Sequence, residues 1–97
     1  MDFEDKMCDQ GKERVNRSLR TTINKFFKKY PDYAESCIFR KDWDGREYTL
    51  IIEDSLMWSA LNGEYGWDIY TAWHKAFDGC EYYPEMQNSC VVNFWKN

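Results

Sequence analysis

The sequence predicts a small α+β domain in which helices pack against an antiparallel sheet. Three observations carry this prediction: an amphipathic stretch that ends at Pro31, a hairpin signature at Asp44-Gly45, and a β-branched and aromatic stretch near the C-terminus. A chain of 97 residues has the length of one domain, so residues 1–97 are taken as a single unit. The expected order is α-β-β-α-α-β, with a three-stranded sheet that helices cover on one side.

The first element is expected to be a helix that begins near residues 8–12 and ends before Pro31. Its apolar side chains recur every three to four residues, which places them on one face. Asp9 is a plausible N-cap, and a proline keeps the residue before it out of helical geometry. The apolar face is expected to hold Val15, Leu19, Ile23, Phe26, Phe27 and Tyr30.

The sequence pattern over residues 37–52 predicts a β-hairpin. Asp44-Gly45 supplies the positive φ angles that a tight hairpin turn needs. Along the second strand Tyr48, Leu50 and Ile52 alternate with residues of the other face, so one face is fully apolar.

The rest of the chain predicts two helices and a last strand. Asp54 or Ser55 is expected to cap a short helix over residues 56–61, and another helix is expected to begin near Trp67 or Asp68.

The stretch 80–88 is interpreted as a loop around Pro84. Residues 90–95 have the β-branched and aromatic content of a final strand.

Charge divides the chain into a basic segment and an acidic one. Residues 10–29 hold seven bases and one acid, a net charge of +6, whereas residues 47–97 hold eight acids and two bases, a net charge of −6. The acidic segment also carries four of the five tryptophans. Such asymmetry bears on partners and encounter rates more than on fold.

Acids interleaved with aromatics predict a surface that binds a protein with a basic face. Carboxylates steer a basic partner toward them, and aromatic side chains then supply the buried contacts. We therefore expect a small non-enzymatic inhibitor of a larger protein, of the phage or mobile-element anti-defence kind (anti-CRISPR or anti-restriction), which covers a nucleic-acid-binding surface. An immunity protein or antitoxin against a nuclease toxin is the alternative in the same class. The expected contact residues are Asp42, Trp43, Asp44, Glu47, Glu64, Tyr65, Trp67, Asp68, Glu81, Tyr82 and Tyr83.

A second class of function would use the basic helix. Lys and Arg on one surface can contact phosphates, which would make the protein a nucleic-acid-binding accessory protein. The net charge of −4 opposes a long polyanion, so this alternative ranks lower. Its candidate residues are Arg14, Arg17, Arg20, Lys25 and Lys28.

Catalytic and cofactor motifs do not stand out, so no enzyme, cofactor or metal is expected. The single histidine, His74, lacks a recognisable nucleophile context. A zinc site from His74, Cys37, Cys80 and Cys90 is disfavoured, because structural zinc ligands usually come in closely spaced pairs.

The four cysteines, with Cys8 the first, are expected to be mostly buried thiols in a cytoplasmic protein. The N-terminal residues lack the pattern of a signal peptide, and no apolar run has the length of a membrane span.

Overall fold

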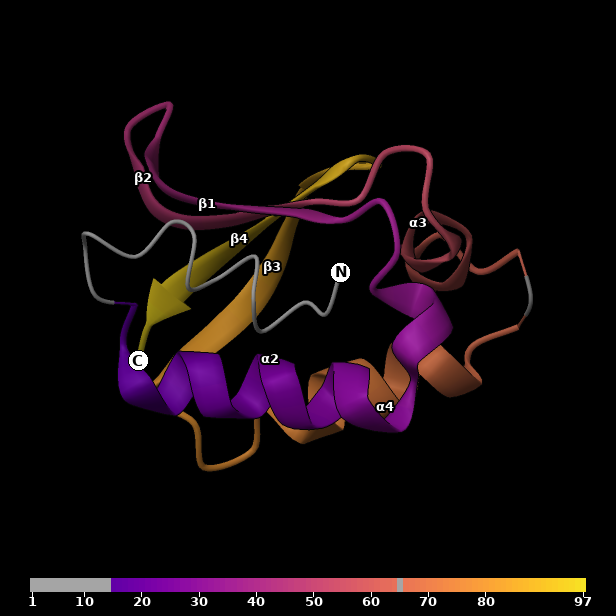
Figure 1. Ribbon diagram of the computed structural model, residues 1–97, viewed down its shortest axis with the longest axis horizontal. Coiled ribbons are helices and arrows are strands. Elements are labelled where there is room, and N and C mark those ends of the chain that lie inside the picture. The colour runs from indigo at the N-terminus through magenta and orange to yellow at the C-terminus, as the bar shows by residue number, and fades with distance from the viewer. Residues whose placement is uncertain (1–14, 65) are drawn as a thin grey trace.

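The computed structural model describes residues 15–64 and 66–97, and it shows an α+β domain (Figure 1). A four-stranded antiparallel sheet has the strand order β1-β2-β4-β3. The α+β class is therefore confirmed, but the expected order was one strand short, since a further strand precedes the last one. None of the helices in the described part is long and apolar enough to cross a membrane.

Helix α2 (Arg17–Lys29) carries the predicted apolar face. Leu19, Ile23, Phe26 and Phe27 are buried in the core. The helix begins at Arg17 and not near residues 8–12, because the side chain of Asn16 accepts a hydrogen bond from the Leu19 N–H at 3.1 Å and so acts as N-cap. The expected N-cap, Asp9, lies outside the described residues.

Helix α2 ends where the sequence predicted. Pro31 opens a short 3-10 turn, η1 (Pro31–Tyr33), directly after the C-cap residue Tyr30. Lys28 and Lys29 lie in the last turn of α2, where positive charge is favourable to the helix dipole.

The hairpin is confirmed as β1 (Ile38–Trp43) and β2 (Arg46–Ile51). Asp44 and Gly45 have φ angles of 52° and 76°, the geometry of a two-residue hairpin turn with positive φ at both positions. Tyr48, Leu50 and Ile52 are all buried on the helix-facing side of the sheet.

Two short helices follow, α3 (Leu56–Leu61) and α4 (Asp68–Ala76). Ser55 is the N-cap of α3, and its hydroxyl accepts a hydrogen bond from the Trp58 N–H at 3.2 Å. In Figure 1, α2 and α4 lie side by side below the sheet, and α3 lies at one end of it.

The prediction of a loop over residues 80–88 was wrong. Residues 82–88 form β3 (Tyr82–Asn88), which pairs with β4 (Val91–Lys96), and Pro84 stands opposite Phe94. β3 is an edge strand of the sheet, and a proline is tolerated there because its missing N–H can face away from the neighbouring strand.

The core between the sheet and the helices is dominated by aromatic rings. Trp73 of α4 is 1% exposed, and its ring centroid lies 5.0 Å from that of Phe26, 4.9 Å from that of Phe77 and 6.1 Å from that of Phe94. One side chain thus joins α2, α4 and β4, which fixes the two helices relative to the sheet.

Candidate binding surfaces

The expected acidic and aromatic residues divide between two ends of the molecule. Those of the β1–β2 turn and the start of β3 lie at the end where β4 finishes, whereas Glu64, Trp67 and Asp68 lie in and beside the α3–α4 connection at the opposite end (Figure 1). Tyr65 lies outside the described residues. These residues were predicted to form one face, whereas in the structure they lie on two separate surfaces.

The surface at the hairpin end is less acidic than its carboxylates suggest. Lys41 forms an ion pair with Asp42 at 2.9 Å, and Arg46 forms one with Asp44 at 2.7 Å. The carboxylate of Glu47 accepts a hydrogen bond from the hydroxyl of Tyr82. These carboxylates already have partners within the hairpin end, so their attraction for another protein is reduced.

Tyr82 is buried, at 5% exposed, and so contributes little to any contact surface. Burial, together with its hydrogen bond to Glu47, raises the pKa of the Tyr82 phenol well above its usual value. Its neighbour Tyr83 is exposed on the other face of the sheet, opposite Trp95 of β4. Trp95 was not among the expected contact residues, and the alternation of a strand at 82–88 would have indicated it.

The surface at the α3–α4 end is built around Trp67. At 57% exposed, its side chain is the most exposed large apolar one in the described part of the chain. It is nevertheless held in place, because its ring lies against Gly63 and meets the ring of Tyr70 edge-on at 5.1 Å. A Cβ atom on Gly63 would approach the Trp67 ring to 2.6 Å.

The neighbours of Trp67 make this surface negative. Glu64 and Asp68 are exposed, and neither takes part in an ion pair with another described residue. Tyr70 extends the aromatic row to His74, whose ring lies 4.5 Å away. Partial burial lowers the pKa of His74, which favours its neutral form.

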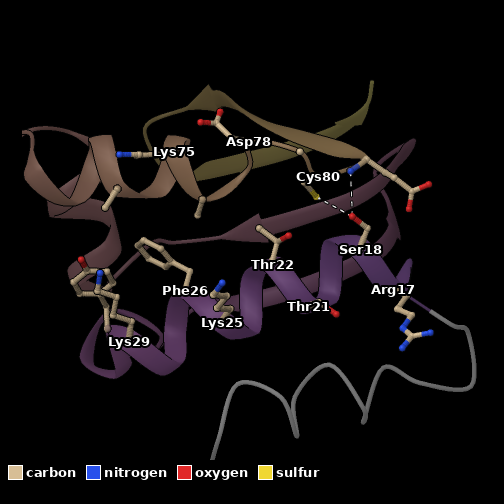
Figure 2. Close-up of a pocket in the computed structure, with 15 residues that line it drawn as sticks. Arg17, Ser18, Thr21, Thr22, Lys25, Phe26, Lys29, Lys75, Asp78 and Cys80 are labelled. Carbon is tan, nitrogen blue, oxygen red and sulfur yellow. Dashed lines mark hydrogen bonds between the residues drawn. The ribbon is translucent and has the colours of Figure 1, made fainter.

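The basic helix forms one wall of a groove (Figure 2). The groove has a volume of about 900 Å³ and lies between α2 and α4. Of the expected basic residues, Arg17 and Lys25 line it, whereas Arg20 and Lys28 are exposed elsewhere on α2 and Arg14 lies outside the described residues.

Two further groove lysines had not been expected. Lys29 lies four residues after Lys25, which lies eight residues after Arg17 on α2, a pattern that the sequence does contain. Lys75 comes from α4, and only the packing of the two helices brings it to the same groove.

At one end of the groove, Ser18 of α2 is hydrogen-bonded to the loop that precedes β3. The hydroxyl of Ser18 donates a hydrogen bond to Cys80 Sγ at 3.5 Å and accepts one from the Glu81 N–H at 3.2 Å. These contacts hold the loop before β3 against the first turn of α2, and they fix the shape of this end of the groove.

Cys37 and Cys80 are buried thiols, as expected, whereas the Cys90 thiol is partly exposed. Cys8 lies outside the described residues. Within residues 15–64 and 66–97, no three His, Cys, Asp or Glu side chains gather as metal ligands would.

Comparison with known proteins adds no relative: no family model, no curated protein and no solved structure matches this chain.

Proposed function

We propose that this protein binds a larger protein through the Trp67 surface and inhibits it by occupying a basic site. The Trp67 surface consists of Gly63, Glu64, Trp67, Asp68 and Tyr70. One observation supports the proposal above the others: a tryptophan that is 57% exposed packs against Gly63 and Tyr70, and the acids on either side of it in sequence, Glu64 and Asp68, have no ion-pair partner in the described part of the chain.

The contacts that restrict the exposed Trp67 ring favour binding for an entropic reason. A mobile side chain loses about 0.5–1.5 kcal/mol of conformational freedom when it is immobilised at an interface. The contacts with Gly63 and Tyr70 already restrict the Trp67 ring in the free protein, so less freedom remains to be lost. Tryptophan is also among the residues that most often dominate binding energy.

The two carboxylates specify the chemistry of the partner. An arginine side chain can stack its guanidinium on the open face of an indole and donate hydrogen bonds to a neighbouring carboxylate. Glu64 and Asp68 are exposed and lie three residues before and one residue after Trp67, so an arginine on this surface is expected to reach the indole and a carboxylate. A partner surface rich in arginine fits it best.

Arginine-rich surfaces of this kind commonly bind nucleic acid. The setting we propose is accordingly anti-defence: a phage or mobile-element protein that covers the nucleic-acid-binding surface of a CRISPR or restriction component. An immunity protein that covers a nuclease toxin would use the same contacts.

Capture from a bacterial lysate tests the proposal. Tagged wild-type protein, Trp67→Ala and the double variant Glu64→Lys/Asp68→Lys are compared, with Trp95→Ala as matched control, since Trp95 is an exposed tryptophan at the opposite end of the molecule. We expect one protein to be recovered equally from nuclease-treated and untreated lysate by the wild type and by Trp95→Ala. The Trp67→Ala and double variants should lose it.

Recovery that is unchanged by Trp67→Ala, or that disappears after nuclease treatment, would contradict the proposal. With the captured protein in hand, its association rate should fall steeply as salt rises to about 0.5 M, because exposed charges are screened beyond a few ångströms there. A rate that does not change with salt argues against steering by Glu64 and Asp68.

A further inference from the structure

We propose that the groove between α2 and α4 binds a nucleotide. This inference is independent of the Trp67 surface, because none of the residues that line the groove belongs to that surface.

One wall of the groove presents three cations in a row that Thr21 interrupts. Arg17, Lys25 and Lys29 are multiples of four residues apart on α2, so they lie on one helix face at steps of about 6 Å for every four residues. Lys75 contributes a fourth cation from α4 on the opposite wall (Figure 2).

These four cations are available to a ligand. The ion pairs within residues 15–64 and 66–97 lie in the β1–β2 hairpin and involve none of the four. Lys29 has only a ring contact, with its Nζ atom 5.4 Å from the centroid of Tyr30. Lys25 and Lys29 lie on adjacent turns of α2 without an ion-pair partner in the described part of the chain, so their charges repel each other, and a bound anion relieves this repulsion.

Charge is distributed unequally along the groove. In Figure 2, Lys29 and Lys75 lie toward one end, whereas Cys80 and Arg17 mark the other end. The loop between α4 and β3 brings two acids to the lining: Asp78 lies between Lys75 and Cys80 (Figure 2), and Glu81 is held at the Arg17 end by its N–H bond to Ser18. A long polyanion that filled the whole groove would meet these acids. A short ligand fits both parts of the lining when its phosphate lies at the lysines of α2 and its hydrogen-bond donors lie toward Asp78 and Glu81.

The remaining lining suits the other parts of a nucleotide. Thr21 and Thr22 provide hydroxyl groups from α2, while Ala72 and Ala76 are small and leave room for a flat ring between the helices. The partly buried ring of Tyr30 provides an aromatic surface at the lysine end. The volume of about 900 Å³ lies within the range of pockets that hold small organic ligands.

An acidic peptide fits this groove less well. Its carboxylates are spread along its length, so some of them would lie beside Asp78 and Glu81, and it brings no planar donor-bearing group to the alanines. The base and ribose of a nucleotide carry amino and hydroxyl groups, which can donate hydrogen bonds to the carboxylates of these two acids. The groove therefore favours a nucleotide over a peptide.

Titration calorimetry with defined probes tests the proposal. The probes are ATP and a thymidine tetranucleotide, with inorganic triphosphate and a hexaglutamate peptide for comparison, all in a buffer that contains a metal chelator. The variants are Lys25→Glu and Lys75→Glu. Lys28→Glu is the matched control, because it makes the same charge change on an exposed position of α2 that does not line the groove.

We expect at least one nucleotide probe to bind more tightly than triphosphate. Each groove variant should weaken that binding at least about tenfold, whereas Lys28→Glu should change it by less than about twofold. Circular dichroism and thermal unfolding of each variant verify that it is folded.

Four results would overturn the proposal: no binding of either nucleotide probe, triphosphate binding as tight as nucleotide binding, a preference for hexaglutamate, or an equal loss in Lys28→Glu and Lys25→Glu. None of them bears on the Trp67 surface, so failure here is distinguishable from failure of the proposed inhibition.

Discussion

Replacing Gly63 with alanine should disturb the Trp67 surface by a predictable amount. Gly63 has a φ of +80°, a conformation that costs a residue with a Cβ atom about 1–2 kcal/mol. The new Cβ atom would also lie 2.6 Å from Cη2 and Cζ2 of Trp67, about 1 Å closer than the carbon–carbon optimum. The ring must therefore move and lose its edge-on contact with Tyr70, which contributes about 0.5–1.5 kcal/mol.

Gly45→Ala separates the two costs. Gly45 has a similar φ of +76°, but nothing lies within 4 Å of the position of its Cβ atom. Urea unfolding should show a loss of about 1–2 kcal/mol for Gly45→Ala and about 1 kcal/mol more for Gly63→Ala. In protein labelled with fluorotryptophan, only Gly63→Ala should shift the fluorine resonance of Trp67. Equal losses in the two variants, with an unmoved Trp67 resonance, would refute the idea that Gly63 positions this ring.

Three further predictions concern the framework that supports these surfaces. Asn16→Ala removes the acceptor for the Leu19 N–H and should lower the free energy of unfolding by about 1 kcal/mol in urea, so an unchanged midpoint would show that the cap is dispensable. Trp73→Ala should cost about 3–5 kcal/mol in thermal or urea unfolding, because Trp73 is 1% exposed and joins α2, α4 and β4, and a loss below about 1 kcal/mol would contradict its central role. Burial lowers the pKa of His74 below 6.5 in the folded protein, so its contribution to stability is present above pH 6.5 and is lost as pH falls below that value. His74→Gln should therefore weaken the pH dependence of the unfolding midpoint between pH 6.5 and 5. An identical pH dependence in the wild type and the variant would disprove this.

Local patterns predicted most of the elements, because they depend on neighbouring residues. The spacing of Leu19, Ile23 and Phe26 indicated the buried face of α2, and Asp44-Gly45 indicated the hairpin turn. The start of α2 was predicted too early, because Asp and Asn are both favourable N-cap residues and the apolar spacing does not distinguish Asp9 from Asn16.

β3 was missed because its proline was interpreted as a strand breaker. A central strand would indeed exclude Pro84, whose missing N–H would leave a neighbouring carbonyl without a partner. Whether a strand lies at the edge of a sheet depends on the strand order, which no local pattern reveals. The order β1-β2-β4-β3 places β3 at the edge, and the sequence alone did not predict that order.

The candidate surfaces were predicted only in part for the same reason. Trp67 and its two acids are close in sequence and were identified together. The groove combines a helical row, which the spacing of Arg17 and Lys25 indicated, with Lys75 of α4, which is far from α2 in the sequence. Contacts of that second kind follow from the packing around Trp73, which the sequence does not specify by periodicity.

The two edge strands of the sheet affect how readily copies of the protein would pair with one another at high concentration. An exposed edge strand can recruit a strand from another molecule and begin a fibre or an unintended dimer. Here one edge strand contains Pro84, and the other contains Asp42 with a φ of +53°, which departs from extended geometry. Each interruption shortens the run of backbone groups that an incoming strand could pair with. At high protein concentration this protection would limit pairing of one copy with another through the sheet edges.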